Sequence, residues 1–206
     1  MKTGQPIALN IVYLPDEPTR NKTIELSQKL AARLPTEYIL NPKNPLPHIT
    51  IYQGLFPIKN QEKVKEVIKQ IASQIKPFEI TLTEFVIGVV KSFVWWNCLK
   101  TSRLAQIQKV VVEKANPLRE GLIPEVIKTY QVSIEEKNQI KKCGSIISPP
   151  HITISRLKNP DDGEKVLKIL GEGEHSVFRV DRIALGHMGD HGTVTGIIES
   201  FPLEGL

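Results

Sequence analysis

The feature that most constrains this chain is a short motif that occurs twice. The sequence PHITI at residues 47–51 recurs at residues 150–154, half a chain length later in a protein of 206 residues. A repeat of this kind indicates an internal duplication. Duplication alone would preferentially retain the apolar packing positions, yet the polar positions match as well. The repeat therefore favours a functional site over a relic of gene duplication.

Strand geometry explains the spacing within each copy. Successive side chains of a strand point to opposite faces, so His48 and Thr50 share one face while the isoleucines between them pack into the core. His151 and Thr153 repeat the arrangement. If a pseudo-twofold relates the two halves, the two His–Thr pairs converge on one central groove.

The remaining sequence mixes strands and helices without strict alternation, which favours an α+β fold over a parallel doubly wound sheet. Apolar alternation and β-rich runs predict strands at 7–14, 48–55, 78–90, 92–99, 151–156, 176–185 and 193–203. Helical periodicity predicts helices at 23–34, 59–75, 102–115, 133–142 and 161–170. Ser133 and Glu136 have the spacing of a capping box. We expect one catalytic domain over residues 1–206, with one motif in each of two lobes.

Composition sets the class of protein. Hydrophobic residues make up 40% of the chain and charged residues 24%, as in globular proteins. There is no run of about 18 apolar residues and no typical secretion signal, so we expect a cytoplasmic protein without membrane contact. Two cysteines, Cys98 and Cys143, give no disulfide framework and are expected to be free thiols.

The net charge of +5 comes from the first half of the chain. This excess could attract a phosphate-bearing partner, but Lys-rich solvated helix faces would give the same count.

Two imidazoles and two hydroxyls suit displacement at phosphorus. Histidine titrates near pH 6.5, so near neutral pH one ring can be neutral and the other charged. The neutral ring would take a proton from the attacking water or hydroxyl, and the charged ring would protonate the leaving oxygen. Threonine hydroxyls can donate hydrogen bonds to the non-bridging phosphate oxygens. This chemistry needs no metal ion and no cofactor.

The strings PHITIY and PHITISR resemble the paired H-x-T-x motifs of the two-histidine (2H) phosphoesterase superfamily. The similarity is greatest to its bacterial 2′-5′ RNA ligase-like and cyclic phosphodiesterase branches, and it extends over essentially the whole chain. It implies a bilobal fold with antiparallel sheets around a central cleft and helices packed outside. It also implies metal-independent chemistry on 2′,3′-cyclic or 2′-5′ phosphodiesters of RNA ends or small nucleotides.

By this resemblance, His48 and His151 would be the acid–base pair, and Thr50 and Thr153 would bind the phosphate. Arg156 matches a basic residue often found at the end of the second motif. Strict alternation places Arg156 on the opposite face from His151, so a twist or the strand end must bring it back.

Two alternatives stay open. One is 2′-5′ RNA ligation at the same site, and the other is a non-catalytic module that binds RNA or nucleotides. No obligate protein partner is evident.

Several further residues have two interpretations. Tyr52 and Ser155 share the histidine-bearing faces and could line the cleft, with Tyr52 stacking on a base, or they could be rim packing. Trp95 and Trp96 are adjacent in a strand and face opposite ways. One could be a stacking platform, but a packing role for both is the favoured interpretation.

The segment 187–192 (HMGDHG) has two histidines beside an aspartate, a pattern that could bind a metal. Its glycines favour a hairpin turn instead.

Overall fold

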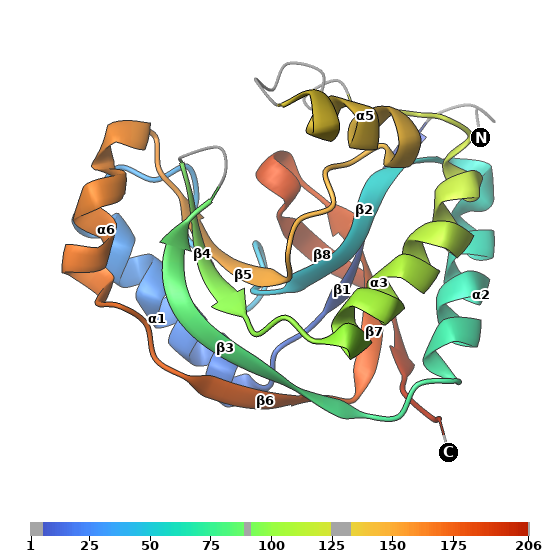
Figure 1. The fold of residues 1–206 in the computed structure, drawn as a ribbon, viewed down its shortest axis with the longest axis horizontal. Helices are drawn as coiled ribbons and strands as arrows, with labels where there is room; N and C mark the ends of the chain where they lie inside the picture. The colour runs from blue at the N-terminus through green and yellow to red at the C-terminus, as the bar shows by residue number, and fades with distance from the viewer. Residues whose placement is uncertain (1–5, 89–91, 125–132, 206) are drawn as a thin grey trace.

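The computed structural model describes residues 6–88, 92–124 and 133–205. They form one curled eight-stranded sheet in which all neighbouring strands are antiparallel (Figure 1). The strands are β1 (Pro6–Tyr13), β2 (Ile49–Pro57), β3 (Phe78–Ile87), β4 (Phe93–Cys98), β5 (His151–Arg156), β6 (Ser176–Val180), β7 (Arg182–Met188) and β8 (Val194–Pro202). The α+β class expected from the sequence is confirmed.

The strand order is β6-β3-β4-β5-β2-β1-β7-β8. Read outward from the centre, β2-β1-β7-β8 form one half of the sheet and β5-β4-β3-β6 the other, and each half, called a lobe below, begins with a strand that carries one of the motifs. These two strands carry the repeated motifs and pair at the rung Ile49–Ile152. The two lobes are interleaved in sequence. Strand β3, from the first half of the chain, lies in the lobe of the second motif, and the C-terminal strands β7 and β8 lie in the lobe of the first motif.

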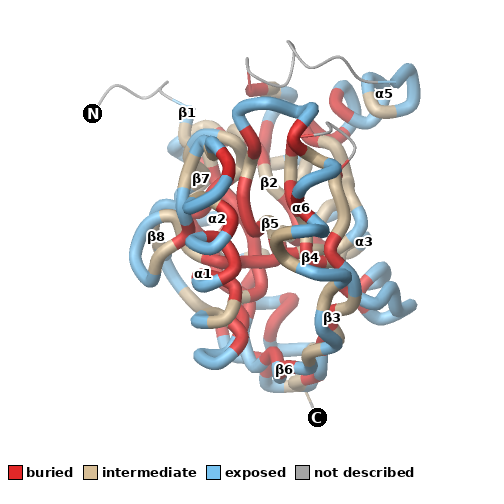
Figure 2. Tube along the Cα trace, turned by 90° about the vertical axis from the view of Figure 1, so that its left-hand side faces the viewer, coloured by how far each residue is buried: buried red, intermediate tan, exposed pale blue. Residues whose placement is uncertain are grey.

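Helices α1 (Glu17–Ala31), α2 (Gln61–Ala72), α3 (Ser102–Ala115) and α6 (Gly163–Leu170) cover the outer face of both lobes, and the chain also forms α5 (Ile134–Cys143). Helices α1 and α6 pack against each other and on β5 and β3, while α2 and α3 pack on β8 and β2. Helix α5 lies apart from them, above the open end of the curled sheet (Figure 1). The strands hold most of the buried hydrophobic residues, and buried segments run through the sheet in Figure 2.

Local signals account for the helix ends. Asp16 and Thr101 cap the first turns of α1 and α3, each accepting a bond from a backbone N–H three residues on. The predicted capping box of Ser133 and Glu136 is present in α5. Helix α1 begins before the predicted residue 23, because Asp16 and Pro18 form its start.

Two strand predictions need revision. The predicted strand 176–185 is two strands, since the chain leaves the β3 partner at Asp181 and continues as β7 beside β1. The end of the predicted strand 78–90, with the tight connection at Lys91, lies outside the described residues.

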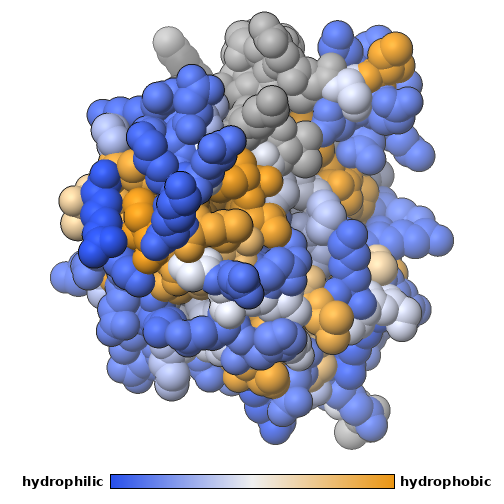
Figure 3. Space-filling view, turned by 60° about the vertical axis from the view of Figure 1, so that its left-hand side comes forward, coloured by the Kyte–Doolittle hydropathy of each residue, from blue (hydrophilic) through white to orange (hydrophobic). Residues whose placement is uncertain are grey.

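The surface is mostly hydrophilic, with apolar patches visible from one side (Figure 3). Within the ranges described, no helix is both long and apolar enough to cross a membrane. Cys98 and Cys143 are free thiols, as expected, and the structure places both in the interior.

Candidate active site

One cavity of about 420 Å³ is lined by both repeated motifs. His48, Thr50, His151 and Thr153 all contribute to its wall. The antiparallel rung Ile49–Ile152 explains the convergence, because its flanking positions set His48 opposite Thr153 and Thr50 opposite His151. The structure therefore brings together the four residues singled out from the repeat. Segment 145–149 and Glu136 of α5 close the cavity on another side.

Both histidine rings are held in the same way. The carbonyl oxygen of Leu46 lies 2.8 Å from Nδ1 of His48, and that of Pro149 lies 2.7 Å from Nδ1 of His151. A carbonyl can only accept, so each Nδ1 carries the hydrogen. In the neutral ring this leaves the lone pair on Nε2, which makes Nε2 the nitrogen available for proton transfer in both rings.

Burial keeps both rings neutral near pH 7. Desolvation lowers the pKa of His48, which is 8% exposed, while the Leu46 and Gly192 carbonyls oppose this shift. Desolvation also lowers the pKa of the half-buried His151 to about 4, against the Pro149 carbonyl and together with repulsion from His48. The sequence suggested one charged ring near pH 7. A bound phosphate anion would restore that state by raising both pKa values.

A β-bulge follows the threonine in each motif. Thr50 pairs with Val12 and Tyr52 with Ile11, so Ile51 is an extra residue in β2. Ile154 is the corresponding extra residue in β5, between the pairs Thr153–Trp95 and Ser155–Val94. Each bulge reverses the alternation of side chains along its strand. The residue after the bulge, Tyr52 or Ser155, therefore faces the core, and the following residue, Gln53 or Arg156, faces the cavity side.

The bulges take Tyr52 and Ser155 off the histidine-bearing faces. Tyr52 reaches the cavity wall but is only 1% exposed, and its hydroxyl donates to the carbonyl of Cys143 at 2.7 Å. It offers no open face for stacking on a base. Ser155 is fully buried away from the cavity and donates to the Tyr38 carbonyl at 3.3 Å.

The same bulges bring the fifth residue after each histidine to the cavity side. In the first motif this residue is Gln53, which lines the cavity. In the second it is Arg156, whose guanidinium contacts Nδ1 of His191 and lies 5.2 Å from the ring centroid of Phe93. His191 and Phe93 line the cavity, so Arg156 stands one residue behind its wall. The bulge resolves the conflict that strict alternation posed for Arg156.

Aromatic residues shape the second half of the site. The Trp95 ring stacks on His151 with centroids 3.9 Å apart and planes at 19°. Trp96 faces the core, where its Nε1 donates to the carbonyls of Thr83 and Glu174. Of the two interpretations of this pair, Trp95 is thus the ring at the site and Trp96 is packing.

Asn10 is a site residue that the sequence analysis missed. It lies on β1, is fully buried and approaches Nε2 of His48 within 3.5 Å. A lone asparagine inside the apolar strand IALNIVYL was the available signal, because a buried amide needs partners.

The segment 187–192 forms a turn, as its glycines favoured. Asp190–Gly192 is a single 3₁₀ turn, and His191 adopts a positive φ of 60°. No cluster of three or more metal-ligating side chains occurs in the part of the chain that the structure describes.

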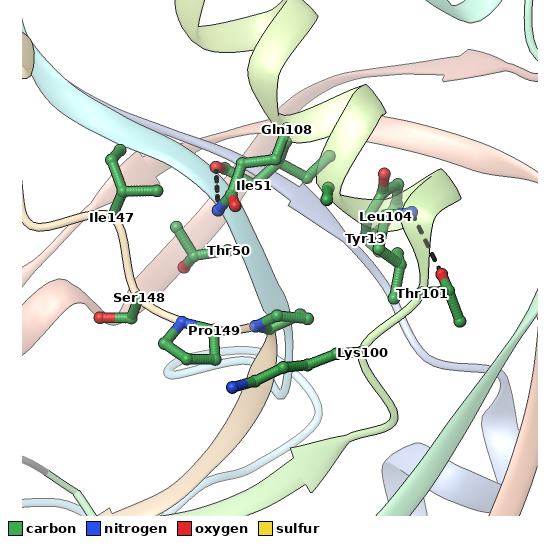
Figure 4. Close-up of a pocket in the computed structure, with 12 residues that line it drawn as sticks. Tyr13, Thr50, Ile51, Lys100, Thr101, Leu104, Gln108, Ile147, Ser148 and Pro149 are labelled. Carbon is green, nitrogen blue, oxygen red and sulfur yellow. Dashed lines mark hydrogen bonds between the residues drawn. The ribbon is translucent and has the colours of Figure 1, made fainter.

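A second, smaller cavity of about 260 Å³ adjoins the first and shares Thr50 and Gln108 with it (Figure 4). Gln108 of α3 donates to the Ile51 carbonyl at 3.2 Å, and Lys100 extends along the opposite wall.

The fold has solved counterparts. TT0787 of Thermus thermophilus aligns with a TM-score of 0.65 and 16% identity, over 97% of this chain and 99% of that one. Escherichia coli LigT complexed with NADP+ aligns at 0.61 and 15% identity, with 97% and 99% coverage. LigT complexed with 3′-AMP aligns at 0.57 and 17% identity, again over 97% and 99%. At these identities the similarity shows the fold alone.

Sequence comparison identifies the family. No curated protein sequence matches this chain. The profile described as the 2′-5′ RNA ligase superfamily matches residues 39–192, a span that includes both motifs. The chain therefore belongs to the 2′-5′ RNA ligase superfamily of two-histidine (2H) phosphoesterases.

Proposed function

We propose that this protein is a metal-independent phosphodiesterase that opens 2′,3′-cyclic phosphates or cleaves 2′-5′ linkages of RNA or nucleotides. The observation that carries the proposal is the presence of two histidines in one cavity, each held through Nδ1 so that Nε2 is available. Two such nitrogens supply a base and an acid for in-line displacement without a metal.

The reaction uses one proton on the histidine pair. Binding of the anionic phosphodiester favours protonation of one ring. The neutral ring takes a proton from water as its oxygen bonds to phosphorus. The phosphorus–ribose oxygen bond breaks, and the charged ring gives its proton to that oxygen. The products are a phosphomonoester and a ribose hydroxyl, and exchange with solvent resets the two rings.

The threonines would bind the phosphate. Thr50 and Thr153 lie opposite the histidine of the other motif, so each hydroxyl is close to both halves of the site. Their hydrogen bonds would stabilise the charge that develops on the non-bridging oxygens. Arg156 would add positive charge from behind the wall through its contact with His191.

A nucleotide-sized substrate fits the available space. Ligand pockets commonly measure about 300–1,000 Å³, and this cavity holds about 420 Å³. The related LigT structures contain NADP+, 3′-AMP and ATP, which supports a nucleotide ligand here. The net charge of +5 is also compatible with an anionic ligand such as an RNA end or a nucleotide.

The reverse direction is the second candidate, favoured by the 2′-5′ RNA ligase description of the family. In this direction a 5′-hydroxyl replaces water and gives its proton to one histidine as its oxygen bonds to the phosphorus of a 2′,3′-cyclic phosphate. The bond from phosphorus to the 3′-oxygen breaks, the other histidine protonates that oxygen, and a 2′-5′ phosphodiester is left.

Turnover in the presence of EDTA tests the proposal. The protein should open a nucleoside 2′,3′-cyclic phosphate or cleave a 2′-5′ dinucleotide, and each of H48A and H151A should reduce kcat at least 10²-fold. His175, which is exposed, provides the matched control in H175A. Loss of activity on chelation would point to a metal hydrolase. Nucleotide binding without turnover, unaffected by H48A, would point to a binding module.

A further inference from the structure

We propose that Gln108 of α3 is a substrate-binding residue that favours open phosphodiesters with a free ribose hydroxyl beside the phosphate. In a 2′-5′ linkage this group is the 3′-hydroxyl, whereas a 2′,3′-cyclic phosphate has no such group. The class of substrate rests on the proposed function, but the hydrogen bond to a ligand can be measured by binding alone.

Helix α3 places Gln108 at the boundary between the two cavities. The helix packs on β2, and Gln108 lines both the cavity of the histidines and the smaller one beside it. Its side chain reaches from α3 to the part of β2 that carries Thr50 and Ile51 (Figure 4). Gln108 therefore lies next to one of the two threonines that are proposed to bind the phosphate.

A backbone carbonyl fixes which end of the Gln108 amide is turned to β2. Ile51 is the extra residue of the bulge, so the ladder with β1 leaves it unpaired. Nε2 of Gln108 donates to the Ile51 carbonyl at 3.2 Å. Since a carbonyl can only accept, the NH₂ end of the amide must face Ile51, and the oxygen Oε1 is left for another partner.

The oxygen Oε1 of Gln108 has no donor among the residues that the structure describes, because the bond to Ile51 is the only hydrogen bond of this side chain there. The side chain is half-buried in the wall of both cavities, so a ligand can reach it. An amide oxygen at this place accepts a hydrogen bond either from water or from a donor of the ligand.

Support of the bulge does not by itself account for a glutamine at residue 108. The second motif has a bulge at Ile154, and no side chain of the described ranges donates to the carbonyl of that residue. A bulge in this sheet is thus formed without a side-chain donor. The acceptor end of Gln108 is the part of the residue that a ligand would use.

The position beside Thr50 indicates which donor of the ligand fits. An acceptor oxygen close to an anionic phosphate is unfavourable unless a hydrogen-bond donor satisfies it. In a 2′-5′ linkage the 3′-hydroxyl lies on the carbon next to the phosphate ester and can donate to Oε1. A 2′,3′-cyclic phosphate would set an ester oxygen against Oε1, so the same residue disfavours this substrate.

The test compares three substrates with the wild-type protein and Q108L. They are a 2′-5′ adenosine dinucleotide, its analogue that lacks the 3′-hydroxyl beside the phosphate, and adenosine 2′,3′-cyclic phosphate. For the wild-type protein, loss of the hydroxyl should lower kcat/KM about 3–10-fold, mainly through KM. Q108L should lower kcat/KM for the intact dinucleotide by the same factor and change the other two substrates less than twofold. Q106L, at an exposed position of α3 that lines neither cavity, is the matched control and should change none.

Two kinetic results would overturn the inference. One is an equal loss in Q108L on all three substrates, which would assign Gln108 to the support of the bulge alone. The other is a wild-type protein that does not distinguish the dinucleotide from its 3′-deoxy analogue. This second comparison needs no variant, so it holds even if Q108L fails to fold.

Calorimetric titration with the two dinucleotides separates this inference from the proposed function. If no substrate is turned over, the wild-type protein should still bind the intact dinucleotide about 3–10-fold more tightly than the 3′-deoxy analogue, and Q108L should bind both equally. That result would refute the phosphodiesterase activity and leave the contact of Gln108 intact. Equal affinity of the wild-type protein for both dinucleotides, or binding of neither, would overturn the contact itself.

Discussion

Desolvation of His151 makes the stability of the fold depend on pH in a defined direction. The pKa of His151 is about 4 in the folded protein and about 6.5 when unfolded. Above pH 6.5 the His151 ring is neutral in both the folded and the unfolded protein, so its titration does not change the free energy of unfolding. Below it the unfolded chain binds the proton first, so stability falls from pH 6.5 down to about 4. One pKa unit is about 1.4 kcal/mol, which gives at most about 2 kcal/mol at pH 5 and about 3 kcal/mol at pH 4.

The assay is urea unfolding of the wild-type protein and H151Q between pH 7.5 and 4.5, followed by far-UV circular dichroism. H151Q removes the titrating group, so the wild-type protein should lose up to about 2 kcal/mol more than the variant between pH 7 and 5. Carboxylates titrate in both proteins and cancel in the difference. H175Q, which changes an exposed histidine, should behave as wild type. Parallel loss of stability in wild type and H151Q would refute the burial argument.

Two further variants test individual contacts. Y52F removes the hydroxyl that donates a hydrogen bond to the Cys143 carbonyl, so the free energy of unfolding should fall by about 1–3 kcal/mol. The KM for a nucleotide should change less than twofold. A large rise in KM with unchanged stability would instead make Tyr52 a ligand-binding residue. A Cβ at Gly88 would lie 2.6 Å from the Trp95 ring, so G88A should displace the indole from His151 and lower kcat. The control variant G196A, whose new Cβ would have no atom within 4 Å, should leave kcat unchanged. Equal activity of G88A and wild type would show that the stack is dispensable.

The sequence predicts the core of the site because its signal is local. A period of two within each motif fixes which side chains share a face, and the repeat of His and Thr indicates where two such faces meet. The bulges at Ile51 and Ile154 carry no such signal, because their position is set by pairing with β1 and β4. Strict alternation therefore assigns Tyr52 and Ser155 to the histidine-bearing faces and Arg156 to the opposite face, and only the strand pairing reverses these assignments.

Partner choice between distant strands is likewise non-local. The interleaving of the lobes depends on β3 pairing with β6 and β7 pairing with β1, and neither follows from the sequence pattern. Asn10 was missed for the same reason, since its role depends on His48 and Gly192, which lie far from it in the chain.

Convergence of the two motifs on one phosphorus atom is tested most directly by titrating the protein with inorganic phosphate while observing its histidine side chains by NMR. The resonances of His48 and His151 should shift together with a single Kd, and the pKa values of both rings should rise. Phosphate should leave the resonances of exposed His175 in place. A response from only one of the two rings, or two different dissociation constants, would contradict a shared site.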